Sequence, residues 1–167
     1  MKLKIANLLF LSLLVSACGV VPKAFQGDFT AKESGATLQL TAAKGVLQLQ
    51  NGRTIEAKAQ ALDFKKLAKS ETGIYLAQSK VNSKLMEVYW IQPLEPLKKE
   101  TPDFGWFRGE VFFSFFDQSD LQKKELANQI TLFHCAEGQI LLDFKNKSWQ
   151  VGCPPAPEVF IFQRNPK

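Results

Sequence analysis

Three cysteines and a single histidine are the residues of this chain best suited to chemistry. Cys135 and Cys153 stand 18 residues apart, and His134 directly precedes the first of them. The third cysteine, Cys18, follows an apolar run near the N-terminus. A thiol can be acylated, oxidised to a disulfide, or used as a nucleophile beside an imidazole base. The surroundings of each cysteine indicate which of these chemistries it suits.

The first 17 residues have the layout of a secretory signal. Two lysines lie within the first four residues, an apolar run covers residues 5–15, and the small residues Ser16 and Ala17 precede Cys18. The apolar run is too short to span a bilayer. No other apolar stretch approaches that length, so the rest of the chain is expected to form a soluble domain.

The residues Val15-Ser16-Ala17-Cys18 resemble the lipobox of bacterial lipoprotein signal peptides. The resemblance implies that the Cys18 thiol receives a diacylglycerol group, that residues 1–17 are removed and that Cys18 becomes the N-terminus. Two or three acyl chains hold a protein stably on a membrane, whereas one does not. Gly19 follows Cys18 where an aspartate commonly marks inner-membrane retention, which implies the outer membrane in a double-membraned host. The alternative is an ordinary cleaved signal or an uncleaved anchor.

The two remaining cysteines are interpreted as a disulfide. In an oxidising compartment an even pair is more often a disulfide than a metal or redox site. The predicted Cys135–Cys153 bond closes a loop of 18 residues, which is worth about 3 kcal/mol on the chain-entropy model. The alternative uses Cys135 as a nucleophile with His134 as its base. Adjacent residues on a strand point to opposite faces, so this geometry is poor.

The length of the chain beyond residue 17 suits one domain with a hydrophobic core. We expect residues 18–24 to form the lipidated N-terminus and a short tether, and residues 25–167 to form a single β-rich domain. Removing residues 1–17 lowers the formal charge from +5 to +3. The remaining charge is spread out, which suits a surface facing anionic lipid headgroups and predicts no nucleic-acid partner.

Alternation of apolar and polar residues predicts an all-β, mainly antiparallel fold. After Asn51-Gly52, a three-residue loop over residues 50–52 would place Leu47 opposite Ile55 and keep the apolar rows on one face. This requires Gly52 in the left-handed conformation. The same argument, applied to a four-residue loop over residues 42–45, pairs Leu40 with Leu47.

Later strands and short helices are expected from the same patterns. The predicted strands are 74–78, 85–91, 104–116, 130–135, 139–144, 148–152 and 159–163. Short helices are predicted at 64–69, capped by Asp63, and at 120–128, capped by Ser119. Prolines mark loops at 92–103 and 154–157. With no βαβ rhythm, this order favours an up-and-down β-barrel or a two-sheet sandwich with one or two short helices.

The segment Phe25-Gln26-Gly27-Asp28-Phe29 resembles the Gly-x-Trp entry strand of lipocalins. Phe29 occupies the position of the tryptophan, and the chain shows no second lipocalin motif. The resemblance favours the barrel over the sandwich and implies a small apolar ligand.

The strand at 104–116 is rich in aromatic residues, which would form rows on both of its faces. Trp106, Phe112 and Phe116 share one face with three polar residues, and the other row is Phe107, Val111, Phe113 and Phe115. One row belongs in the core. An exposed second row would mark a binding surface, so Trp106, Phe112 and Phe116 are candidate binding residues. Alternatively, the helix at 120–128 or a loop covers that row.

No catalytic motif is present. A single histidine rarely supports a triad or a zinc site, and the chain has no Gly-x-Ser-x-Gly, His-Glu-x-x-His or phosphate-binding loop. We therefore expect no enzyme, no cofactor and no metal. The sequence favours a membrane-anchored bacterial envelope lipoprotein that acts as a non-catalytic interaction or structural module, with the bilayer and an envelope protein as partners. The alternative is a lipocalin-like binder of a small apolar ligand.

Overall fold

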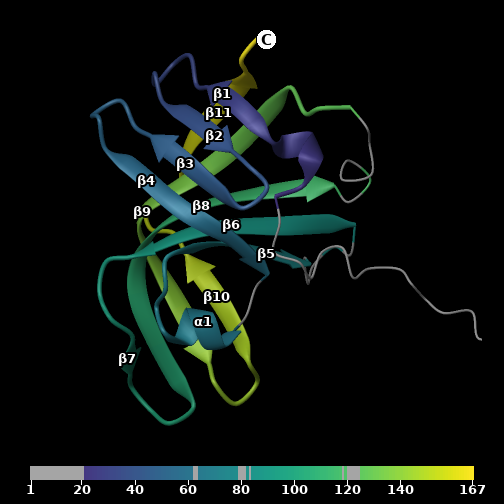
Figure 1. The fold of residues 1–167 in the computed structure, drawn as a ribbon. Helices are drawn as coiled ribbons and strands as arrows, with labels where there is room; N and C mark the ends of the chain where they lie inside the picture. Colours follow the sequence, from purple (N-terminus) through teal and green to yellow (C-terminus); the bar gives the residue numbers. More distant parts are fainter. Residues whose placement is uncertain (1–20, 62–63, 79–81, 83, 118, 120–124) are drawn as a thin grey trace, which may run out of the picture.

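The structure is a computed structural model that describes residues 21–61, 64–78, 82, 84–117, 119 and 125–167 (Figure 1). Cys18 and the whole predicted leader lie outside the described residues, so the lipobox interpretation stays a prediction. Among the described residues, no helix is long and apolar enough to cross a membrane.

The strands form a closed nine-stranded β-barrel, in the order β9-β11-β1-β2-β3-β4-β5-β6-β8, with β8 pairing back to β9. The elements are β1 (Gly27–Thr30), β2 (Thr37–Leu40), β3 (Lys44–Gln48), β4 (Thr54–Ala61), α1 (Phe64–Ala68), β5 (Gly73–Gln78), β6 (Leu85–Pro93), β7 (Lys98–Lys99), β8 (Phe104–Asp117), β9 (Gln129–Asp143), β10 (Ser148–Gly152) and β11 (Glu158–Arg164). The prediction of an all-β, mainly antiparallel fold is confirmed, with the barrel as its architecture.

The β3–β4 hairpin has the predicted register. Leu47 lies opposite Ile55, and Gly52 is left-handed with φ +81°. The side chains of Leu47 and Ile55 are both buried, at 1% and 3% exposure. Burial of one apolar row therefore decides the loop length, as argued from the alternation.

The β2–β3 register differs from the prediction. Leu40 lies opposite Gly45, and Leu38 takes the position opposite Leu47. The shift is two residues, which keeps both apolar rows on the same face, so the alternation alone does not distinguish the two registers. A Cβ at Gly45 would lie 3.0 Å from Leu40 Cδ2, so the glycine makes room for close packing inside the barrel.

Two further predictions need correction. The strands expected at 130–135 and 139–144 are one continuous strand, β9. The described part of the second expected helix, residues 125–128, is irregular, and the rest lies outside the described residues.

The first expected helix is present as α1, which crosses over so that β4 and β5 pair in parallel. This parallel pair is a departure from a pure up-and-down barrel.

The hydrophobic core has two parts. One cluster fills the barrel and includes Phe29, Leu38, Trp90, Phe112 and Phe162. A second cluster lies outside the barrel wall. There β8 and β9 continue past the barrel as residues 104–109 and 138–143, which we call the β8–β9 extension. β7 and β10 flank the extension, and Leu67 of α1 is fully buried in the second cluster. Figure 1 shows α1, β7 and β10 at the opposite end of the molecule from β1 and β11.

The two ends of the described chain meet on the barrel. β1 pairs with β11, with Phe29 opposite Arg164. The Arg164 guanidinium donates hydrogen bonds to the carbonyls of Ala127, Gln26 and Ala24 at 2.6, 2.8 and 3.0 Å, and it lies 4.5 Å from the Phe29 ring centre. The first described residue, Val21, is already buried.

Candidate functional site

Two of the three candidate binding residues face the barrel interior. Phe112 is 1% exposed and lies with its ring centre 4.3 Å from that of His134, almost parallel to it. Phe116 is partly buried against the interior cluster, with its ring centre 4.0 Å from that of Phe25. These aromatic side chains therefore pack in the core of the protein.

Trp106 lies apart from the other two, on the β8–β9 extension. It is partly exposed and stands opposite Lys98 on β7 and Leu141 on β9. Its indole N–H donates to Glu100 Oε1 at 2.8 Å, and Lys98 Nζ lies 4.8 Å from the ring centre. The three residues share one face of β8, but the barrel encloses only part of that face.

The opposite row of β8 divides between core and surface. Phe107 and Val111 are fully buried in the second cluster, whereas Phe115 is 45% exposed. The exposed part continues sideways across β9 and β11, because Phe113 pairs with Phe133 and Phe133 pairs with Val159. We call this surface the outer aromatic face; its residues are Phe113, Phe115, Phe133, Val159 and Ile161.

The outer aromatic face is contiguous. The rings of Phe113 and Phe133 stack at 5.1 Å, and Phe115 lies 5.8 Å from Phe113. Val159 and Ile161 are 51% and 48% exposed, and they line a groove of about 490 Å³ that also includes residues 31–34. The alternation in the sequence predicts that the whole row from Phe107 to Phe115 lies in the core. It does not predict the exposed end of the row, because alternation does not reveal where a covering layer ends.

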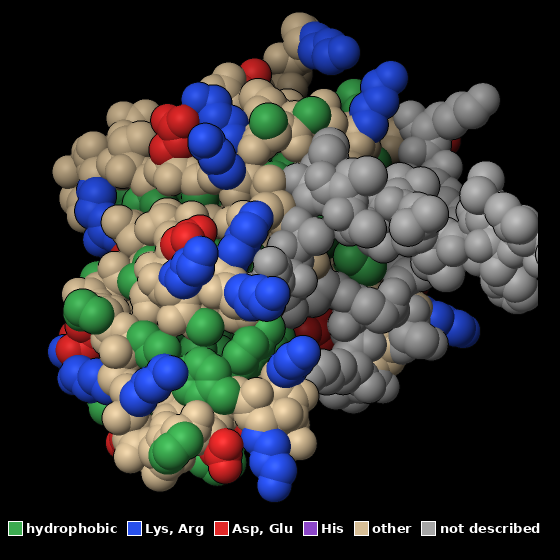
Figure 2. All heavy atoms as spheres, turned by 60° about the horizontal axis from the view of Figure 1, so that its bottom comes forward, with side chains coloured by type: hydrophobic (Ala, Val, Ile, Leu, Met, Phe, Trp, Pro, Cys, Tyr) green, Lys and Arg blue, Asp and Glu red, His purple; other side chains and the backbone are tan. Residues whose placement is uncertain are grey.

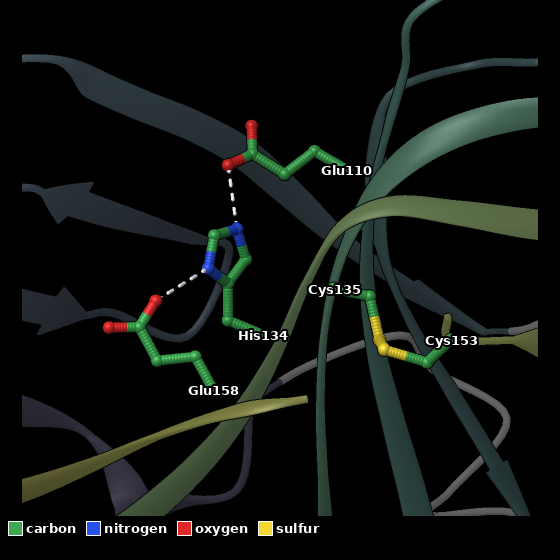
Figure 3. The surroundings of a disulfide bond; sticks show 5 residues. All are labelled: Glu110, His134, Cys135, Cys153 and Glu158. Carbon is green, nitrogen blue, oxygen red and sulfur yellow. Dashed lines mark hydrogen bonds and ion pairs between the residues drawn. A yellow bond between two sulfur atoms is a disulfide. The ribbon is translucent and has the colours of Figure 1, made fainter. Parts of the chain in front are cut away.

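A polar cluster lies where the barrel meets the extension. It consists of Arg53, Glu110, His134 and Glu158. Glu110 is 3% exposed, and its Oε1 atom lies 2.8 Å from His134 Nε2. Arg53 forms an ion pair with its other oxygen, Oε2, while Glu158 Oε2 lies 3.6 Å from His134 Nδ1. Figure 3 shows the imidazole held between the two carboxylates.

Each ring nitrogen of His134 faces a carboxylate oxygen, Nε2 that of Glu110 and Nδ1 that of Glu158. Burial lowers the pKa of His134 below its ordinary value, with Arg53 acting in the same direction and Glu158 opposing it. Among the described residues, His134 hydrogen-bonds to no hydroxyl or thiol. The contacts of the cluster hold the Glu110 carboxylate between His134 and Arg53.

Cys135 is not available as a nucleophile because it is bonded to Cys153, which confirms the predicted disulfide. The Cα atoms of the two residues are 5.5 Å apart. Figure 3 shows the disulfide on the other side of β9 from the His134 ring. The bond joins β9 to the residue that follows β10, and so it holds β10 against the extension.

A cleft opens at the end of the barrel near β1, between β8 and β9. The ladder between these strands ends at Phe113 and Phe133. Beyond that point β8 pairs with β6, and β9 pairs with β11. The cleft measures about 570 Å³ and is lined by Phe25, Phe116, Ile130 and Leu126, with Asp117 and Glu125 among its polar residues. We call it the end cleft.

The end of the molecule with α1 and the extension carries many basic residues. Figure 2 shows lysine and arginine side chains around a group of hydrophobic ones on this face. Two of these cations, Lys98 and Arg108, are paired with Glu95, at 3.1 and 2.6 Å. Among the described residues, no group of three or more histidine, cysteine or acidic side chains is arranged to hold a metal ion.

No family model, curated protein or solved structure matches this chain.

Proposed function

We propose that the protein is a membrane-anchored envelope lipoprotein whose β-barrel is a non-catalytic interaction module, and that it binds an envelope protein through the outer aromatic face. The observation that carries this proposal is the exposure of Phe115 on β8 and of Val159 and Ile161 on β11, each close to half, on the two sides of Phe133 on β9. Contiguous apolar surfaces of this kind are uncommon on monomeric soluble proteins and mark contact sites.

The anchor is supported by Val15-Ser16-Ala17-Cys18 and by the short chain that follows. Val21 and Ala24 are buried, at 6% exposure each, and Val21 N–H donates to the Ala42 carbonyl at 2.9 Å. Val21, three positions after Cys18 in the sequence, is thus already part of the described fold. Acyl chains on Cys18 would hold the barrel close to the lipid surface, on the outer membrane in a double-membraned host.

Replacing Cys18 by serine tests the anchor. We expect the Cys18→Ser protein to lose lipidation, as measured by mass spectrometry, and to leave the membrane fraction or retain residues 1–17. Normal membrane retention of an unlipidated, processed protein would contradict the anchor and leave the outer aromatic face to be tested separately.

Site-specific photo-crosslinking tests the contact surface. A photoreactive phenylalanine analogue at Phe115 or Ile161 is expected to capture one protein of defined mass in native membranes. The matched control places the same analogue at Leu94, which is 54% exposed and outside the face. Equal capture from Leu94, or no capture from either face position, would contradict the proposed surface.

The alternative of a small apolar ligand is favoured by the end cleft, because Phe25, Phe116 and Ile130 line it. The barrel interior offers less room, since Phe112 and Trp90 pack there with ring centres 6.2 Å apart. Saturable binding of a fluorescent fatty acid, lost on Ile130→Asp and kept on Ile161→Asp, would support this alternative over the protein partner.

A further inference from the structure

The β8–β9 extension carries a second surface, distinct from the outer aromatic face. A groove of about 330 Å³ lies on it, formed by β8, β9 and β10. Phe104 and Leu141 are exposed there, at 54% and 45%, and Trp106 borders it. We call this the extension groove. Its volume lies at the lower end of the range for small-ligand sites.

Trp106 is held in a fixed orientation beside the groove. Its N–H is bonded to Glu100, and Lys98 lies over its ring. Lys98 lies on the β7 side of β8, whereas the groove that Trp106 helps to line extends over the β9 and β10 side. A fixed aromatic surface loses little conformational entropy on binding, which favours affinity.

The polar residues of the groove suit hydroxyl groups. Among the described residues, the side chains of Ser148 and Gln150 have no hydrogen-bond partner, and both line the groove. Glu100 and Asp143 line it as well. The Asp143 carboxylate accepts hydrogen bonds from the backbone and side chain of Asn146.

The charge of the lining selects among ligands. The lining includes two carboxylates and no lysine or arginine, and the nearby Lys98 is paired with Glu95 and lies over the Trp106 ring, so the lining itself offers no cation to a phosphate or an acidic polymer. A flat aromatic surface next to amide, hydroxyl and carboxylate groups is suited to a ring that has one apolar face and hydroxyls at its edge. A pyranose sugar has this chemistry, because its C–H groups pack on the negative face of an aromatic ring.

We propose that the extension groove binds a neutral glycan, with a pyranose ring packed on Trp106 and its hydroxyls bonded by Ser148 and Gln150. This site is separate from the outer aromatic face. The protein would thus hold an envelope glycan at one end of the molecule and a protein partner on the barrel wall.

The test uses the full chain in detergent. It is applied to an array of neutral and acidic glycans, and each hit is then titrated by calorimetry. We expect binding of a neutral oligosaccharide that weakens about tenfold in Trp106→Ala, corresponding to about 1.4 kcal/mol. Gln150→Ala should weaken it several-fold, whereas Trp106→Phe should retain most of the affinity. The matched control, Phe115→Ala, removes an exposed aromatic ring elsewhere and should bind normally.

Three outcomes would overturn the proposal. One is the absence of saturable binding to every neutral glycan at millimolar concentration. Another is equal affinity in Trp106→Ala, with thermal unfolding showing that the variant is folded. The third is preferential, salt-sensitive binding of acidic glycans or of a basic peptide. A failure here would leave the partner captured through Phe115 unaffected, so the two proposals are distinguishable.

Discussion

Glu110 is a carboxylate inside a hydrophobic barrel wall, at 3% exposure. Removing a charge from water is costly unless its partners supply comparable interactions. Here His134 Nε2 is hydrogen-bonded to one oxygen, and Arg53 pairs with the other. The three residues come from β8, β9 and the β3–β4 turn, so the pairing also fixes how these elements meet. Removing either partner would leave one oxygen of the buried carboxylate without its partner.

Stability is expected to depend on the protonation of His134. Its pKa is lowered in the folded protein, so the unfolded chain binds the proton first as the pH falls. The free energy of unfolding should therefore decrease as the pH falls through the ordinary histidine value of about 6.5. Urea unfolding at pH 7.5, 6.5 and 5.5 measures this decrease.

The control is His134→Gln, whose amide can donate to Glu110 but does not titrate. This variant should show a flatter dependence over the same range. A wild-type protein that becomes more stable between pH 7.5 and 5.5 would contradict the prediction. It would mean that the two neighbouring carboxylates outweigh burial.

Arg164 is expected to be irreplaceable by lysine. Its guanidinium reaches three carbonyls in a plane, which a lysine ammonium on a flexible stem does not reproduce. Arg164→Lys should lower the free energy of unfolding by about 2 kcal/mol. The matched control is Arg108→Lys, on an exposed ion pair with Glu95, for which little change is expected. Equal effects of the two substitutions in chemical denaturation would contradict this role.

At the scale of the elements, local alternation predicted most strands but not their partners. The hairpin at Gly52 was predictable because both its register and its turn depend on residues close in sequence. The single long β9 was not, because Gly138 interrupts the apolar pattern. There the ladder shifts register, with Gly109 opposite Gly138 and Val111 opposite Cys135. This bulge lets one strand serve both the barrel and the extension.

The candidate site was predictable only in part, for the same reason. The aromatic content of β8 and the disulfide follow from the sequence. The burial of each aromatic row of β8 depends on α1, on β10 and on the closure of the barrel. These features involve residues that are distant in the sequence. Glu110 gave no signal of burial, because its partners Arg53 and His134 are distant in the chain. A buried carboxylate is evident only once the strands are paired.

The disulfide is expected to stabilise β10 in particular. Replacing both Cys135 and Cys153 by alanine should lower the free energy of unfolding by about 3 kcal/mol, since the closed loop spans 18 residues. Amide exchange should rise in residues 148–152 more than in β2. Dithiothreitol should reproduce both effects in the wild type. Two free thiols in the untreated protein, found by mass mapping, would contradict the bond.

At the scale of the whole molecule, the barrel separates its surfaces. The outer aromatic face lies on the wall formed by β8, β9 and β11, and the extension groove lies beyond the barrel on β8, β9 and β10. β8 and β9 contribute to both. The two strands run through both surfaces, and the register shift between Gly109 and Val111 lies between them.

The pairing of β1 with β11 has a consequence for the folding of the newly synthesised chain. β1 pairs with β2 on one side and with β11, the last strand in the sequence, on the other. The Arg164 side chain of β11 then donates hydrogen bonds to the carbonyls of residues 24 and 26. During synthesis from the N-terminus, this edge of β1 therefore stays unpaired until β11 has been made. Open edges invite pairing with other chains. Truncation of β11 would leave the same edge open and remove the Arg164 hydrogen bonds to residues 24 and 26.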